Sequence, residues 1–307
     1  MRYQVFGRTG FPVSTVSMGS NRLGDPGVDP AQWPPIVRRA RELGVNFFDT
    51  SNSYNQGRSE AVLGEVLSAD PERTYVSTKV GYPPITNDGS KREYSAKTIL
   101  TEVEDSLRRL RRDTIDLYML HSPTVRQLET DDWATAIDKL KTQGKIRFFG
   151  ISTQDHASGI WAIQHGAEFL QIEYHLLDWS AEDELLPLAQ KNDVGIMVRM
   201  PLARGLLTGK FPVGQAIPLE QQWRRPTGDL LQLRLQRIEQ LRFLERDGQT
   251  LAQAAIRFVL SHPAVHCAIP GARTVEQLEA NIPAADGDLT PAELARIKDL
   301  QREWSRG

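Results

Sequence analysis

The 307-residue chain is 40% hydrophobic and 25% charged, which is the composition of an ordinary globular protein and not of a disordered one. Its formal net charge of −2 offers no electrostatic basis for binding nucleic acid or an anionic membrane, and we expect neither partner. The lone cysteine, Cys267, excludes an internal disulfide and a cysteine-based zinc site. Since the chain also lacks a signal-like or membrane-length apolar segment, we expect a cytoplasmic enzyme without a bound metal.

The predicted strands begin with a hairpin, at residues 2–5 and 12–15, around a glycine-containing turn. Eight short β-branched or aromatic runs follow along the chain, and their unbroken apolar character is typical of a buried parallel sheet. These runs lie at residues 15–19, 46–49, 74–79, 115–120, 146–151, 169–172, 195–198 and 266–269.

Segments of helical periodicity separate these runs, at residues 34–43, 59–67, 95–110, 133–142 and 185–190. In the third segment Ile99, Val103 and Leu107 fall on one helix face, and Ser95 is placed to cap its N-terminus. Eight alternating units without an intervening linker predict one α/β domain over residues 1–307, a (β/α)8 TIM barrel. A proline-rich segment at 211–230 predicts a functional loop, and residues 291–304 predict an extra C-terminal helix.

Charged and polar residues stand where the predicted strands end. Asp49 ends the second strand, Lys79 ends the third, and His121 follows the fourth. Active sites of such barrels lie at the carboxyl ends of the strands, and a charge buried there needs a partner. We therefore expect these three side chains to meet in one site.

Tyr54 comes five residues after Asp49 and gives the three groups a chemical purpose. A phenol, with an ordinary pKa of about 10, is a reluctant acid at neutral pH. The ammonium of Lys79 beside it favours the phenolate and so makes it a better proton donor. Asp49 can hold Lys79 charged and in place, while His121 can orient an incoming carbonyl oxygen. The four residues predict a site that protonates a carbonyl group.

With these residues the chain resembles the aldo-keto reductases. Asp49, Tyr54, Lys79 and His121 match the catalytic tetrad of that family in identity and order, and residues 48–54 and 57–60 match its signature. Further matching segments lie at 116–118, 150–152, 171–174, 201–203, 205–210 and 269–281. The resemblance implies a reductase that transfers a hydride from NADPH to a small-molecule aldehyde or ketone, with Tyr54 as the proton donor.

The resemblance also implies an extended NADP(H) across the barrel mouth. Ser152 and Gln171 would bind its carboxamide, Lys210 would meet the pyrophosphate, and Arg273 would suit a 2′-phosphate. The implied cofactor residues are Gly19, Ser20, Asp49, Ser152, Thr153, Gln171, Arg199, Pro201, Leu202, Gly205, Leu207, Lys210, Gly271, Ala272, Arg273, Gln277 and Asn281. The implied substrate residues are Asn21, Tyr54, Tyr82, His121 and Trp223.

Three positions depart from the family pattern: Thr153 and His175 each replace an asparagine, and Arg199 replaces an aromatic residue that stacks on the nicotinamide in many members. A guanidinium beside a ring that becomes positive on oxidation should disfavour the oxidised cofactor. Alternatively, Arg199 turns toward a carboxylate and leaves Met200 or Leu202 to pack the ring.

Two other interpretations stay open. The β subunits of voltage-gated potassium channels resemble this family and act largely as partners of other proteins, so the chain could be an NADPH-binding module with little turnover. It could also be a TIM-barrel aldolase that forms a Schiff base on Lys79. Nothing in the pattern predicts an oligomeric state.

Overall fold

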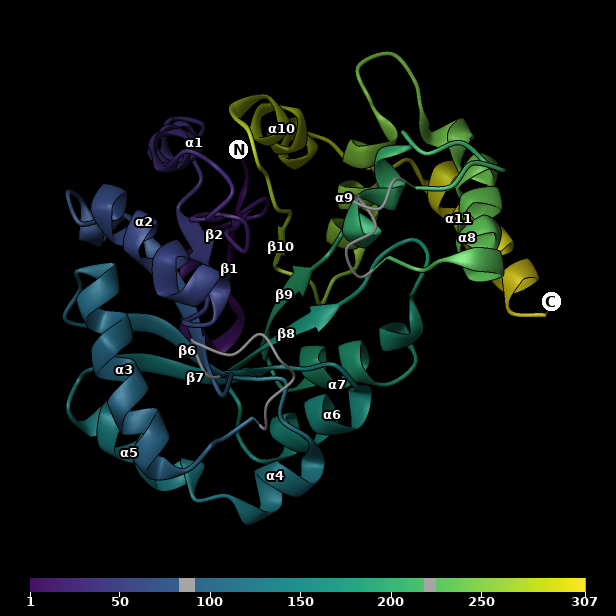
Figure 1. The fold of residues 1–307 in the computed structure, drawn as a ribbon. Helices are drawn as coiled ribbons and strands as arrows, with labels where there is room; N and C mark the ends of the chain where they lie inside the picture. The colour runs from purple at the N-terminus through teal and green to yellow at the C-terminus, as the bar shows by residue number, and fades with distance from the viewer. Residues whose placement is uncertain (83–91, 218–224, 307) are drawn as a thin grey trace.

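The strands of the computed structural model, which describes residues 1–82, 92–217 and 225–306, follow the predicted order. An antiparallel hairpin of β1 (Tyr3–Val5) and β2 (Pro12–Ser14) precedes the barrel, as expected. In the described ranges, eight parallel strands then pair in chain order from β3 to β10 (Figure 1). They are β3 (Met18–Gly19), β4 (Phe47–Asp49), β5 (Tyr75–Val80), β6 (Ile115–His121), β7 (Ile146–Ser152), β8 (Phe169–Glu173), β9 (Gly195–Arg199) and β10 (Cys267–Ile269).

The sheet closes on itself through single bridges between the first and last strands. Val16 pairs with Ala268, and Gly19 pairs with Gly271. The predicted (β/α)8 barrel with its leading hairpin is therefore confirmed. The first predicted strand is the least accurate, because the Thr15 amide donates to the Arg2 carbonyl of the hairpin and only Met18 and Gly19 pair with β4.

The helices surround the strands (Figure 1). They are α1 (Trp33–Glu42), α2 (Arg58–Leu67), α3 (Ala96–Leu110), α4 (Val125–Thr130), α5 (Trp133–Thr142), α6 (His156–Gln164), α7 (Leu185–Lys191), α8 (Gly228–Gln240), α9 (Leu251–Ser261), α10 (Val275–Asn281) and α11 (Pro291–Trp304). The Ser95 hydroxyl accepts from the Thr98 amide and caps α3 as predicted. The extra C-terminal helix has the predicted bounds, whereas the predicted loop at 211–230 ends earlier, because α8 begins at Gly228. No helix in the described ranges is both long enough and apolar enough to cross a membrane.

Side-chain alternation along the strands determines which end of the barrel can hold a site. One set of alternate residues fills the barrel interior as a separate apolar cluster that includes Phe47, Met119 and Phe169. Phe6, from the turn of the hairpin, packs its ring 6.1 Å from those of Phe47 and Phe169 and closes the amino-terminal end. In β4, β8 and β9 the next inward positions, two residues further along the strand, are the polar residues Asp49, Gln171 and Arg199. The inward polar side chains of these strands therefore lie at the carboxyl end.

Candidate active site

Asp49 and Lys79 form a buried ion pair at the carboxyl end of the barrel. The Lys79 ammonium lies 2.8 Å from each Asp49 carboxylate oxygen and donates to the Thr50 carbonyl at 2.7 Å. The exposed fraction of the Lys79 side chain is 0%, and that of Asp49 is 3%. Both occupy inward positions, Asp49 two residues after Phe47 and Lys79 two residues after Ser77. The structure thus brings Asp49 and Lys79 into contact, as the sequence predicted.

The same carboxylate holds two further side chains from neighbouring strands. Asp49 Oδ1 accepts from the Ser77 hydroxyl and from the Gln171 amide, each at 2.8 Å. The Ser152 hydroxyl in turn donates to Gln171 Oε1 at 3.0 Å. Ser152 and Gln171, implied as carboxamide ligands, are therefore joined directly to the charged pair. Ser77 is a member of this network that the sequence argument did not name.

Lys79 also lies against the ring of Tyr54, with its ammonium 4.8 Å from the ring centroid. Burial raises the pKa of Tyr54, and the charge and hydrogen bond of Lys79 lower it, but the net direction is upward. Burial lowers the pKa of Lys79, yet Asp49 and Tyr54 more than offset this, so that it is raised overall. The phenol is a protonated donor and the ammonium is charged at neutral pH. The expectation that Lys79 makes the phenol more acidic is correct in sign, but burial outweighs it.

The turn that carries Tyr54 has an unusual backbone. The backbone of Asn55 and Gln56 has positive φ angles, of 49° and 59°, which residues other than glycine rarely adopt. The Asn55 amide donates to the Leu23 carbonyl at 2.7 Å and holds this turn against the preceding loop. The chain therefore accepts local strain in order to present Tyr54 to Lys79.

His121 completes the group with its ring centroid 6.0 Å from that of Tyr54. On its other side it contacts Tyr82, whose ring centroid is 4.6 Å away and edge-on. His121 Nδ1 lies 3.3 Å from the Ser51 hydroxyl, which leaves Nε2 on the opposite side of the ring. All four tetrad residues and Tyr82 are thus brought together, whereas Trp223 lies outside the described residues.

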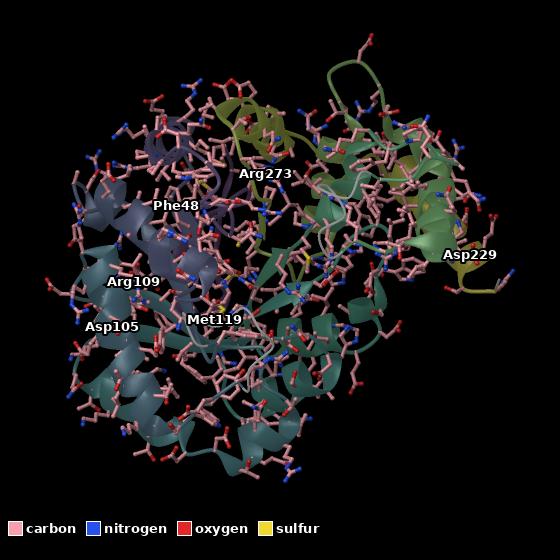
Figure 2. The ribbon with its side chains drawn as sticks, in the orientation of Figure 1. Phe48, Asp105, Arg109, Met119, Asp229 and Arg273 are labelled. Atoms are coloured by element: carbon pink, nitrogen blue, oxygen red, sulfur yellow. The ribbon has the colours of Figure 1, made fainter. Side chains whose placement is uncertain are left out.

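Behind the tetrad, the buried carboxylate of Glu60 joins α2 both to α3 and to the strand that carries Lys79. Glu60 is fully buried, accepts from the Thr78 hydroxyl at 2.6 Å and pairs with Arg109 Nε at 2.6 Å. Figure 2 shows Arg109 on α3, beside the helix that follows Tyr54. Thr78 directly precedes Lys79 in β5. The hydrogen bond from Thr78 to Glu60 therefore fixes α2, the helix that follows Tyr54, against the strand that carries Lys79.

Five cations from four segments gather near the mouth: Arg22, Arg204, Lys210, Arg225 and Arg273. Partial burial lowers the pKa of Arg22, Lys210 and Arg225, and repulsion from neighbouring cations, Arg273 among them in each case, lowers it further. Figure 2 shows Arg273 between the end of β10 and α10. Mutual repulsion of this kind is relieved by a bound anion. Arg22, Arg204 and Arg225 were not predicted, because no local pattern joins them.

Several implied cofactor residues have their side chains occupied by the fold. The Ser20 hydroxyl donates to the Asp49 carbonyl at 2.7 Å. Thr153 Oγ1 lies 2.6 Å from the Ser158 hydroxyl in the first turn of α6. Asn281, at the end of α10, is 6% exposed. Any part that Ser20 or Thr153 plays at the mouth is therefore left to backbone atoms.

The Arg199 guanidinium turns toward a carboxylate, the second of the two arrangements considered from the sequence. Its Nη1 lies 3.1 Å from Glu173 Oε2, and its Nη2 donates to the Thr153 carbonyl at 3.4 Å. His175 Nε2 lies 3.4 Å from the other Glu173 oxygen. Glu173 was not singled out from the sequence, although it ends β8 next to Arg199 in register.

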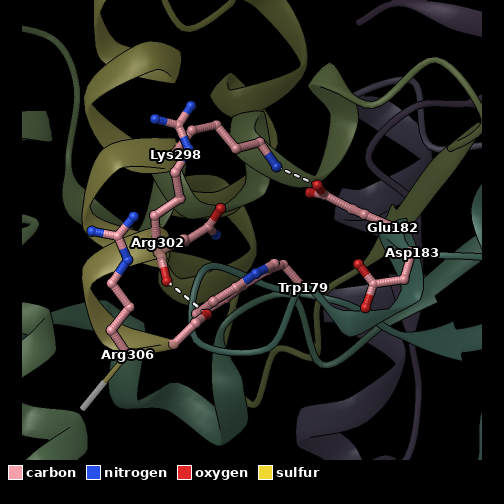
Figure 3. Close-up of a pocket in the computed structure, with 8 residues that line it drawn as sticks. Trp179, Glu182, Asp183, Lys298, Arg302 and Arg306 are labelled. Atoms are coloured by element: carbon pink, nitrogen blue, oxygen red, sulfur yellow. Dashed lines mark hydrogen bonds and ion pairs between the residues drawn. The ribbon is translucent and has the colours of Figure 1, made fainter.

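A hollow of about 380 Å³ lies behind this region, between α11 and the segment that follows β8. Lys298 reaches across it to Glu182, as Figure 3 shows. Glu182 also accepts from the Tyr174 hydroxyl at 2.6 Å, and Tyr174 directly follows Glu173. The walls of the hollow are thus joined to each other, and α11 fixes the segment that bears Glu173 and His175.

Comparison with known proteins gives a consistent result. A sequence model of the aldo/keto reductase family matches residues 15–302. The uncharacterized oxidoreductase YqkF of Bacillus subtilis (strain 168) is 30% identical over 98% of this chain and 96% of its own length. The NADH-specific methylglyoxal reductase of Escherichia coli (strain K12) is 29% identical over 88% and 87%. A putative voltage-gated potassium channel subunit beta of Schizosaccharomyces pombe (strain 972 / ATCC 24843) is 29% identical over 97% and 92%.

Among solved structures, the holo form of the aldo-keto reductase AKR11C1 from Bacillus halodurans is 30% identical, with a TM-score of 0.83 over 98% of this chain and 96% of that one. The apo form of the same protein gives a TM-score of 0.76 at the same identity and coverage. The backbone described above therefore agrees better with the holo form.

Proposed function

The chain belongs to the aldo/keto reductase family, oxidoreductases that act on small molecules with a nicotinamide cofactor, and from this premise we propose that it reduces an aldehyde or ketone with NADPH. Tyr54 is the proton donor in this proposal. The observation that carries it is the Asp49–Lys79 pair, which is buried, charged and packed against the Tyr54 ring beside His121.

Each member of the tetrad has a distinct task in the reaction. Ser152 and Gln171 would hold a nicotinamide ring, which when bound would supply the hydride for the carbonyl carbon. His121 orients the carbonyl oxygen, and Tyr54 gives its hydroxyl proton to that oxygen as negative charge develops there. Lys79 stabilises the phenolate that remains, and Asp49 keeps Lys79 positioned.

The cluster of Arg22, Arg204, Lys210, Arg225 and Arg273 supports a cofactor that carries several phosphate charges. Within the proposal, Lys210 and Arg225 face the pyrophosphate and Arg273 takes a 2′-phosphate. Arg273 suits this role because its side chain is exposed while its backbone amide is held by Gln277 at 2.9 Å. A guanidinium pairs two phosphate oxygens at once, which a lysine cannot do.

Arg273→Ala is expected to weaken NADPH binding by about tenfold to a hundredfold, because one charge-assisted phosphate contact contributes about 1.5–3 kcal/mol. NADH affinity should hardly change, since NADH lacks the phosphate. Fluorescence titration of both cofactors measures this, with Arg302→Ala on the exposed face of α11 as a matched control. If both cofactors weaken equally, or if the wild type already prefers NADH, Arg273 does not read a 2′-phosphate.

Steady-state assay of NADPH oxidation with a panel of aldehydes and ketones tests the reaction itself. The similarity to a potassium channel β subunit keeps the partner-module interpretation as the second candidate. Tight NADPH binding with negligible turnover on good aldehydes would favour it. The aldolase interpretation is disfavoured, because a Schiff base needs a neutral amine and the pKa of Lys79 is raised.

A further inference from the structure

The Arg199–Glu173 pair stands immediately beyond the residues proposed to bind the nicotinamide. Gln171 and Glu173 are successive inward positions of β8, and Glu173 is the register partner of Arg199 on β9. The Arg199 guanidinium also donates to the carbonyl of Thr153, the residue that follows Ser152. A cation and an anion are thus built into the three strands that carry Ser152, Gln171 and Arg199.

The two charges of this pair compensate each other. Burial raises the pKa of Glu173, but His175, Arg199 and Arg204 together lower it to about 2, so Glu173 is anionic at any working pH. Arg199 stays charged because guanidinium groups do not lose their proton in this range. The charges of Arg199 and Glu173 therefore sum to zero in the wild type, although the sequence alone places only the cation Arg199 where the family pattern has an aromatic residue.

His175 packs beside the carboxylate. Its Nδ1 accepts from the Leu177 amide at 3.3 Å, so the proton of the neutral ring is on Nε2, which lies 3.4 Å from Glu173 Oε1 without forming a hydrogen bond to it. The side chain of His175 is 1% exposed and cannot turn toward solvent. Glu173 is therefore held by its ion pair with Arg199, whose Nη1 lies 3.1 Å from Glu173 Oε2.

We propose that Glu173, packed beside His175, is a positioning residue whose carboxylate cancels the charge of Arg199 and thereby sets the relative affinity of the site for oxidised and reduced nicotinamide cofactor. This inference rests on the proposed function. Oxidation places a positive charge on the nicotinamide ring. An uncompensated Arg199 would repel that charge, and an uncompensated Glu173 would attract it, while the reduced ring, which is neutral, would sense neither strongly.

The same guanidinium charge is felt at the proton donor, since Arg199 is among the groups that lower the pKa of Tyr54. Arg199 therefore lies near enough to the reacting groups to act through space. The trio adjusts the electrostatics of the site without contacting the carbonyl.

The test uses substitutions of opposite sign and measures the ratio of dissociation constants for NADP⁺ and NADPH by fluorescence titration. Glu173→Gln leaves Arg199 uncompensated and should raise the ratio by about tenfold or more. Arg199→Met leaves Glu173 uncompensated and should lower the ratio. The double variant, neutral again, should return it close to the wild-type value. Asp183→Asn removes an exposed carboxylate of the segment that follows β8, and should leave the ratio unchanged.

A purely structural role would shift both dissociation constants together and give single-variant changes of the same sign, and either result would overturn the inference. A wild type that binds neither NADP(H) nor NAD(H) would overturn the proposed function instead. Measurable binding with an unaltered ratio in Glu173→Gln contradicts only the inference. If the wild type binds NAD(H) alone, the same ratios are measured with that pair.

Discussion

Tyr54→Phe is expected to lower kcat for carbonyl reduction by about a hundredfold or more, which is the usual scale for the loss of a positioned acid. The substitution removes the hydroxyl and keeps the ring against which Lys79 packs. NADPH affinity should therefore stay similar, and the loss should appear in kcat and in kcat/KM alike. Stopped-flow single turnovers separate this chemical step from product release.

The pH dependence gives a second readout of the same group. An acid is competent below its pKa and fails as pH rises through it, and the pKa of Tyr54 is raised above its ordinary value of about 10. The alkaline limb of the wild-type profile should lie above that pH and should disappear in Tyr54→Phe. Tyr3→Phe, which removes an exposed hydroxyl of the hairpin, is the matched control. Near-normal turnover in Tyr54→Phe would rule out Tyr54 as the donor.

The inward positions of the barrel strands could be predicted because strand geometry is local. Polar residues that end apolar runs must lie at the carboxyl end of a parallel sheet, so Asp49, Lys79 and His121 were placed from the chain alone. The helices that were not predicted range from six residues in α4 to 13 in α8. Of these, α4 and α9 open with a threonine and a glutamine three residues later, the capping-box signal, and could have been found.

What could not be predicted depends on contacts between distant segments. The cation cluster draws Arg22 and Arg225 from loops about two hundred residues apart. Likewise, the sequence shows Glu173 only as a residue at the end of a strand, and its pairing with Arg199 depends on β9 lying beside β8. The net direction of the Tyr54 pKa shift could not be predicted either. The effect of Lys79 depends on one neighbour, whereas the effect of burial depends on everything packed around the ring.

Lys79→Met is expected to abolish measurable reduction and to lower the free energy of unfolding by about 3–5 kcal/mol, because it leaves the Asp49 carboxylate buried without its cation. Asp49→Asn should be damaging too, since it leaves a fully buried ammonium with the Thr50 carbonyl as its remaining neutral acceptor. Urea unfolding and NADPH oxidation measure the two effects. Lys97→Met, at an exposed position on α3, is the matched control.

Combining the two substitutions decides whether the charges act as a unit. If they do, the double variant should be less destabilised than the sum of the single variants by several kcal/mol, and its activity should be no lower than that of Lys79→Met. The Ser77 and Gln171 hydrogen bonds both go to Asp49 Oδ1, so an asparagine that keeps its oxygen at this position preserves them in the double variant. Additive losses would mean that Asp49 and Lys79 contribute separately.

The raised pKa of Lys79 gives this pair a pH signature in stability. A group whose folded pKa lies above its unfolded value of about 10.4 stabilises the protein fully below that pH, and this stabilisation is lost as pH rises toward the folded pKa. Wild-type stability should therefore fall in that alkaline range, in excess of the fall in Lys79→Met, which has no ammonium to titrate. Parallel decline of the two proteins would show that the ammonium is no better stabilised in the folded barrel than in water, and that the tetrad is held together by something other than this ion pair.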